Sequence, residues 1–119
     1  MNSFDIISVR NEQRLFFIEM KALVVGLQEL PEETLFLEKK EELGIWIDSL
    51  SKENQIDKNE ALKIRNAFEN SNQSSIKIYQ LVNQGKRKEA KEALKLFEKR
   101  SKIMLTLLDN LSEKYKNEQ

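Results

Sequence analysis

The sequence predicts an all-α protein that folds as one antiparallel four-helix bundle over residues 1–119. Three observations predict this fold. Apolar residues recur at three- and four-residue spacing through long stretches, which is the period of an amphipathic helix. The chain contains only 3 glycines and 1 proline, too few for the many turns of a sheet protein. Its length of 119 residues allows one compact core, and its 34% charged residues suit long solvated helices.

The first helix is expected over residues 3–30, with Ser3 or Asp5 as the N-cap. Its inward face is formed by apolar residues at helical spacing, namely Phe4, Ile7, Leu15, Phe16, Met20, Leu23, Leu27 and Leu30. Pro31 then predicts the start of a second helix, because proline suits the first helical position and the acids that follow it favour the positive end of the helix dipole. The inward residues of that helix are Leu35, Leu43, Trp46 and Leu50.

Residues 51–59 are polar except for Ile56 and are expected to form a long connection. A third helix begins near Asp57 or Lys58 and ends before Gly85, a residue suited to the left-handed conformation at a helix end. It buries Leu62, Ile64, Phe68, Ser71, Ser75, Ile78, Leu81 and Val82. The fourth helix covers residues 86–115, the tail 116–119 frays, and the buried residues are Ala90, Leu94, Phe97, Met104, Leu107, Leu108 and Leu111.

The charges balance at 20 basic and 20 acidic residues but are unevenly placed. Residues 1–60 carry a net charge of −6 and residues 61–119 a net charge of +6, so the two halves attract each other as they dock. A basic stripe on the fourth helix is interleaved with glutamates and is interpreted as a solvated face; it consists of Lys88, Lys91, Lys95, Lys99 and Lys102. We therefore expect no nucleic-acid partner.

The chain has no Cys and no His, which removes the central residue of most enzyme and zinc-site templates. The acidic cluster of the second helix is interpreted as helix surface; it consists of Glu32, Glu33, Glu38, Glu41, Glu42 and Asp48. We expect no enzymatic activity, no cofactor and no bound metal. The apolar stretches are far shorter than the ~20 residues that span a bilayer, and no secretory leader is apparent. These features predict a cytoplasmic protein that does not insert into membranes.

A polar stretch interrupts the third helix at residues 69–75, and some of its side chains must face inward if Phe68 and Ile78 do. Buried amides and hydroxyls need hydrogen-bond partners. The stretch is either a device that makes the packing specific or the remnant of a site, and both interpretations stay open.

The string Glu41-Glu42-Leu43-Gly44-Ile45-Trp46 resembles the Cys-x-Leu-Gly-x-Trp signature of the chemoreceptor zinc-binding domain family. That family consists of four-helix modules attached to bacterial chemoreceptors and diguanylate cyclases. The resemblance covers residues 10–112, and Leu43, Gly44 and Trp46 match the signature as packing residues. It implies a bacterial signalling module that functions in chemotaxis or a related pathway.

The resemblance also places the family's zinc ligands at Arg14, Glu41, Phe68 and Asn72. These four residues offer one good zinc donor between them, whereas a zinc site needs about four. The sequence therefore predicts a metal-free relative with a vestigial site. One hypothesis is that Arg14 and Glu41 form an ion pair where the metal stood, with Asn72 hydrogen bonded to it and Phe68 filling the remaining volume.

The leading functional hypothesis is a non-catalytic regulatory module of bacterial signalling type that binds a protein partner or a second copy of itself. The alternative is a small helical export chaperone of flagellar type that holds an amphipathic partner helix. An exposed apolar row would favour the alternative, and the candidates are Phe17, Val24, Val25 and Ile45. A third hypothesis is a small-ligand sensor near Ser71 and Ser75. The first helix has apolar residues on more than one face, which predicts a dimer.

Overall fold

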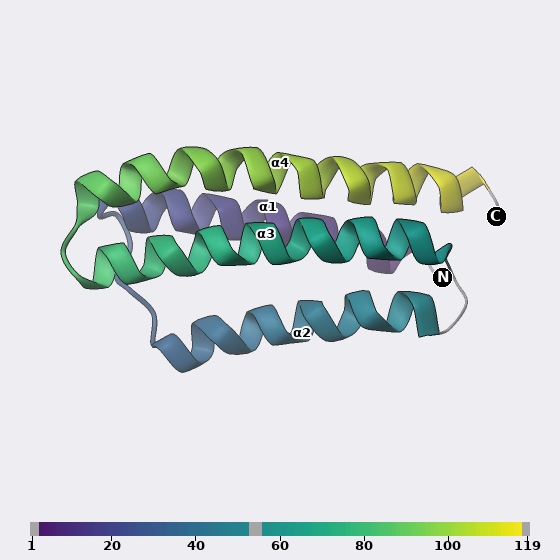
Figure 1. The fold of residues 1–119 in the computed structure, drawn as a ribbon, viewed down its shortest axis with the longest axis horizontal. Coiled ribbons are helices and arrows are strands. Elements are labelled where there is room, and N and C mark those ends of the chain that lie inside the picture. Colours follow the sequence, from purple (N-terminus) through teal and green to yellow (C-terminus); the bar gives the residue numbers. More distant parts are fainter. Residues whose placement is uncertain (1–2, 53–55, 118–119) are drawn as a thin grey trace.

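The computed structural model describes residues 3–52 and 56–117, in which four helices are found (Figure 1). They are α1 (Ser3–Val25), α2 (Glu33–Lys52), α3 (Lys58–Asn83) and α4 (Arg87–Asn117). Within these helices the side chains of residues 3–5, 34–36, 39, 40, 43, 50–52 and 115–117 lie outside the described set. The predictions for the N-cap and for four core side chains fall on those residues, namely Ser3, Asp5, Phe4, Leu35, Leu43 and Leu50. The prediction of an all-α fold with four helices is confirmed.

The helices lie side by side along the longest axis of the molecule, whose extents are 48 × 23 × 21 Å (Figure 1). α4 packs against both α1 and α3, whereas α2 packs mainly against α3. Ion pairs join Arg10 of α1 to Asp109 of α4, and Glu60 of α3 to Lys114 of α4. The beginnings of α1 and α3 therefore both lie beside the end of α4.

Two glycines terminate helices in the same way. Gly85 has a φ of 75° as predicted, and the N–H of Lys86 donates to the carbonyl of Leu81 at 2.8 Å. Gly26 has a φ of 84°, and the N–H of Leu27 donates to the carbonyl of Ala22 at 2.9 Å. In each turn the glycine N–H also donates to a carbonyl of the last helical turn, from Gly85 to Val82 at 3.0 Å and from Gly26 to Leu23 at 3.3 Å. The two hydrogen bonds together form the Schellman motif, which glycine favours because it lacks Cβ. The prediction that the first helix continues to residue 30 is therefore wrong.

The other helix ends agree more closely with the sequence. α3 begins at Lys58 as predicted, where the Asp57 side chain accepts a hydrogen bond from the N–H of Asn59 at 3.3 Å. Pro31 lies two residues before the start of α2 at Glu33 and is not its first helical residue. α4 ends at Asn117, two residues beyond the expected end.

The buried apolar residues form two clusters, one toward each end of the bundle. The first includes Ile6, Val9, Ile47, Ile64, Phe68, Met104, Leu108 and Leu111. The second includes Met20, Leu23, Val24, Ile78, Tyr79, Leu81, Ala90 and Phe97. Four residues predicted to face inward are instead exposed, namely Ile7, Leu15, Leu27 and Leu62. In α1 the core face is set by Ile6, Val9 and Met20, and Leu27 lies beyond the end of the helix.

Four serines are buried between the two clusters, Ser71, Ser74 and Ser75 of α3 and Ser101 of α4. We call them the serine layer. The Ser75 hydroxyl donates to the carbonyl of Asn72 at 2.8 Å, and the Ser74 hydroxyl accepts from Nη1 of Arg100 at 2.9 Å. The inward orientation predicted for part of the polar stretch is thus confirmed, and two of its hydroxyls are paired within the bundle.

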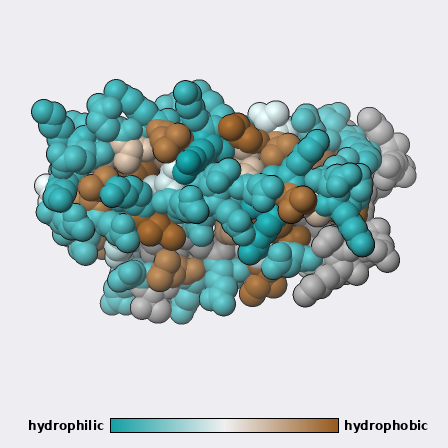
Figure 2. Space-filling view, viewed as in Figure 1, coloured by the Kyte–Doolittle hydropathy of each residue, from teal (hydrophilic) through white to brown (hydrophobic). Residues whose placement is uncertain are grey.

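Apolar side chains also remain on the surface. On the face shown in Figure 2 they are interspersed with hydrophilic side chains. Of the residues proposed for an exposed row, Val25 and Ile45 are exposed, whereas Phe17 packs against Phe97 and Val24 is fully buried. The prediction for Val24 is therefore wrong. In the described part of the chain no helix combines the length and the apolar character needed to span a membrane.

Tyr79 joins α3 to the chain that precedes α2, since its hydroxyl donates to the carbonyl of Pro31 at 2.5 Å. Burial raises the pKa of the Tyr79 phenol, and the carboxylates of Glu33 and Glu32 raise it further. Because the pKa is higher in the folded state, the neutral phenol stabilises the fold fully below its unfolded pKa of about 10. That contribution is lost as the pH rises through the folded pKa.

We therefore expect the free energy of unfolding, measured in urea, to fall as the pH is raised above about 10. Tyr79→Phe removes this contribution to the alkaline loss and costs about 0.5–1.5 kcal/mol at neutral pH, because the hydrogen bond to Pro31 is lost. An alkaline profile identical in the two proteins would contradict the role given to Tyr79.

Candidate functional site

An open groove of about 340 Å³ lies between α2 and α3. Its lining residues are Leu37, Glu41, Gly44, Ile45 and Asp48 of α2 and Arg65, Phe68 and Asn72 of α3. Three of the four positions that the family resemblance assigns to zinc ligands are thus brought together, namely Glu41, Phe68 and Asn72. Gly44 of the signature string lines the same groove.

Arg14 does not lie in this groove. It is exposed on α1, and Glu41 is exposed on α2. No ion pair joins these two side chains, both of which belong to the described part of the chain. The hypothesis of an Arg14–Glu41 pair is therefore not supported. The physical reason is that α1 packs against α4, so that its polar residues are not directed at α2.

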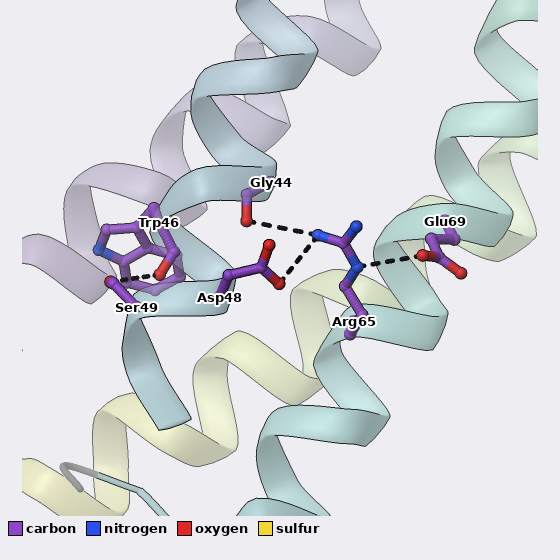
Figure 3. A network of polar contacts seen from close by, with 6 residues as sticks. All are labelled: Gly44, Trp46, Asp48, Ser49, Arg65 and Glu69. Atoms are coloured by element: carbon purple, nitrogen blue, oxygen red, sulfur yellow. Dashed lines mark hydrogen bonds and ion pairs between the residues drawn. The ribbon is translucent and has the colours of Figure 1, made fainter. Parts of the chain in front are cut away.

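The cation of the groove is Arg65, which sequence reasoning missed (Figure 3). Its Nη1 donates to the carbonyl of Gly44 at 3.3 Å and lies 3.2 Å from Oδ1 of Asp48, both in α2. Its Nε lies 3.0 Å from Oε1 of Glu69, one turn further along α3. The guanidinium also stands over the Phe68 ring, with Cζ 5.9 Å from the ring centroid. One side chain thus holds α2 against α3.

Phe68 and Asn72 form the α3 wall of the groove one turn apart. Phe68 is buried and belongs to the first apolar cluster, while Asn72 is half-buried. Oδ1 of Asn72 is buried, and among the described residues nothing donates a hydrogen bond to it. The hydrogen bond from Arg14 to this oxygen that the hypothesis would allow is therefore not formed.

Two signature residues of α2, Gly44 and Trp46, pack against neighbouring side chains of the fold. Trp46 is half-buried and packs against the first apolar cluster, and its carbonyl accepts a hydrogen bond from the Ser49 hydroxyl at 2.6 Å (Figure 3). Gly44 is buried against Arg65 and Phe68. The side chain of Leu43 lies outside the described set. Trp46 therefore contributes to the core.

The acidic cluster and the basic stripe, both interpreted from the sequence as helix surface, consist of exposed residues. The lysines of the α4 stripe are all exposed, and two of them pair along their own helix, Lys95 with Glu92 and Lys102 with Glu98. Such exposed pairs contribute little to stability. Among the described residues no three acidic side chains gather closely enough to hold a metal ion.

Two glycine substitutions should change stability in opposite directions. A Cβ at Gly44 would lie 3.4 Å from Nη1 of Arg65 and 3.6 Å from Cε1 of Phe68, which is ordinary contact. Gly44→Ala is therefore expected to raise the free energy of unfolding by about 0.5–1 kcal/mol through helix propensity. Gly85→Ala should lower it by about 1 kcal/mol, because alanine is strained at a φ of 75°.

Urea unfolding followed by circular dichroism measures both changes. A loss at Gly44 as large as that at Gly85 would show that close approach of α2 to α3 requires glycine.

Comparisons of the chain with protein-family models, with curated proteins and with solved structures gave no match. The resemblance to the chemoreceptor zinc-binding domain therefore stays a prediction from the residues of the signature string.

Proposed function

We propose that this protein is a non-catalytic regulatory module of bacterial signalling type, a metal-free relative of the chemoreceptor zinc-binding domain that acts by binding protein through a helix face. The main support is a line of apolar residues on the outside of α1: Leu15, Ile18, Ala22 and Val25, which we call the α1 row. Leu15 and Ile18 are each 59% exposed and Val25 is 56% exposed. Single exposed apolar residues are common, but these four share one side of the helix at three- and four-residue spacing.

The proposal includes an antiparallel arrangement of the four helices. Its support is the pairing of helix beginnings with helix ends, since Arg10 and Glu60 both meet residues near the end of α4. In that arrangement the α1 row lies on the side of α1 opposite the residues that it buries, including Met20 and Leu23. Leu15, Ile18 and Val25 of the row are therefore exposed, whereas Ala22 between them is half-buried.

The proposal is tested by capturing partners from the native lysate with the tagged protein and identifying them by mass spectrometry. Ile18→Ser disrupts the row, and Ile103→Ser is the matched control because Ile103 is 57% exposed on α4. We expect chemoreceptor, kinase or cyclase components to be retained by the wild type and the control and lost with Ile18→Ser. Equal recovery by all three proteins would contradict the proposal.

The second candidate is a helical export chaperone or adaptor of flagellar type. It is favoured by the groove between α2 and α3, where Leu37 is 43% exposed and Ile45 is 64% exposed beside the buried Phe68. Such a groove suits the apolar face of a partner helix. In the same capture experiment, recovery of flagellar or secreted subunits that is lost with Ile45→Ser, and kept with Ile18→Ser, would establish this function instead.

A further inference from the structure

The α1 row continues in the spacing of a two-stranded coiled coil. Ser8, Asn11, Leu15, Ile18, Ala22 and Val25 are separated alternately by three and four residues, which is the heptad pattern of the two central positions. This line is opposite the face that α1 buries in the bundle. A second helix packed on it would therefore place the rest of its own molecule on the far side, clear of this one.

The charged residues on either side of the α1 row indicate what charge pattern a helix bound to it would carry. Glu12 and Glu19 flank one side of the row, and Arg14 and Lys21 flank the other. In the described part of the chain none of these four side chains forms an ion pair, although Lys21 stands over the Phe17 ring at 5.5 Å. The row therefore has an acidic edge and a basic edge that are both available to another molecule.

We propose that the α1 row binds a second copy of this chain in parallel and in register, with Arg14 of each copy paired to Glu19 of the other. This inference rests on the proposed function and names the occupant of its surface. In a parallel pair of helices, a residue on one edge faces the residue five positions later on the opposite edge of the neighbour, and Arg14 and Glu19 have that spacing. Two equivalent ion pairs result.

An antiparallel pair is disfavoured by the same charges. It would place the basic edges of the two copies together, Arg14 against Lys21, and the two acidic edges together as well. The apolar part of the row covers about three turns, so we expect a reversible dimer.

Sedimentation equilibrium over a range of concentrations tests the association. The apparent molecular mass of the wild type is expected to rise from 14.0 kDa toward twice that value as the protein concentration is raised. Arg14→Glu places like charges beside each other and should weaken the dimer roughly tenfold. Arg14→Glu combined with Glu19→Arg should restore it. Lys88→Glu, a matched change on the exposed surface of α4, should leave the dimer unchanged.

Disulfide crosslinking tests the orientation, because the chain has no cysteine of its own. Asn11→Cys and Ala22→Cys, each studied alone, should both form disulfide-linked dimers in a parallel pair. In the antiparallel pair that sets Arg14 against Lys21, Asn11 faces Ala22, so a crosslink that forms only when the two variants are mixed would overturn the proposal. A mass of 14.0 kDa at every concentration would overturn it as well.

The two proposals fail in different ways. If the chain stays monomeric while Ile18→Ser still loses its signalling partners, the self-association is wrong and the interaction module stands. If the dimer forms as described while no partner depends on Ile18, the dimer stands and the partner-binding function is wrong.

Discussion

Phe97→Ala is expected to lower the free energy of unfolding by about 3–5 kcal/mol, the largest loss that we predict for a single substitution. Phe97 is 1% exposed and projects from α4. The Phe16 ring meets it edge-on with centroids 5.9 Å apart, and the Phe17 ring lies at 5.7 Å. Alanine would leave a cavity between α4 and α1, and both α1 rings would lose their common contact.

The measurement is urea unfolding followed by circular dichroism and by the fluorescence of Trp46, the single tryptophan. Leu96→Ala is the control, since Leu96 is the neighbouring residue and is 48% exposed. We expect it to cost well under half as much. Similar losses at the two positions would mean that α1 does not depend on Phe97 for its attachment.

Arg87→Met is expected to cost about 2 kcal/mol. Nη1 of Arg87, in the first turn of α4, donates to the carbonyls of Leu23 and Val24 at 3.0 and 3.1 Å. These carbonyls belong to the last turn of α1 and lie at its negative end, and that of Leu23 also accepts from the N–H of Gly26 at 3.3 Å. The substitution removes both the charge and the two hydrogen bonds, while the apolar part of the side chain is kept.

Lys88→Met removes an exposed charge from the next residue and should change stability by less than about 0.5 kcal/mol. Arg87→Lys should fall between the two, because an ammonium group keeps the charge without the planar fork. If Arg87→Met unfolds at the same urea concentration as the wild type, water replaces the guanidinium at no cost and this contact does not attach α1 to α4.

The helices themselves could be predicted because their signals are local. Asp57 begins α3 and Gly85 ends it in the expected way. The face of α1 was predicted only in part: Met20 and Leu23 are buried as expected, whereas Ile7 and Leu15 are exposed. The helix is apolar on two sides, and a period of 3.6 residues cannot tell which side meets the core. That choice depends on contacts with distant residues, such as Phe97. Gly26 carried the same signal as Gly85, but the prediction that the first helix continues to residue 30 passed over it.

The candidate site was predicted in part. Glu41 and Gly44 share one face of α2, and Phe68 and Asn72 share one face of α3, so helical spacing alone brings each pair together. Arg14 was placed with them only by the family resemblance, and the packing of α1 on α4 separates it from them. Arg65 was missed, although it lies three residues before Phe68 on the same face. Its four-residue spacing from Glu69, which suits an ion pair along a helix, is the sequence signal that could have identified it.

The serine layer determines how far α3 can slide along α4. Arg100 of α4 reaches the carbonyl of Asn70 at 3.0 Å and the hydroxyl of Ser74 only in the observed alignment. A shift by one helical turn, about 5.4 Å, would break both bonds and set the serines of one helix against the apolar clusters of the other. Apolar residues alone would tolerate such a shift far better. The hydroxyls at the middle of the bundle thus select one alignment of the two longest helices over its neighbours.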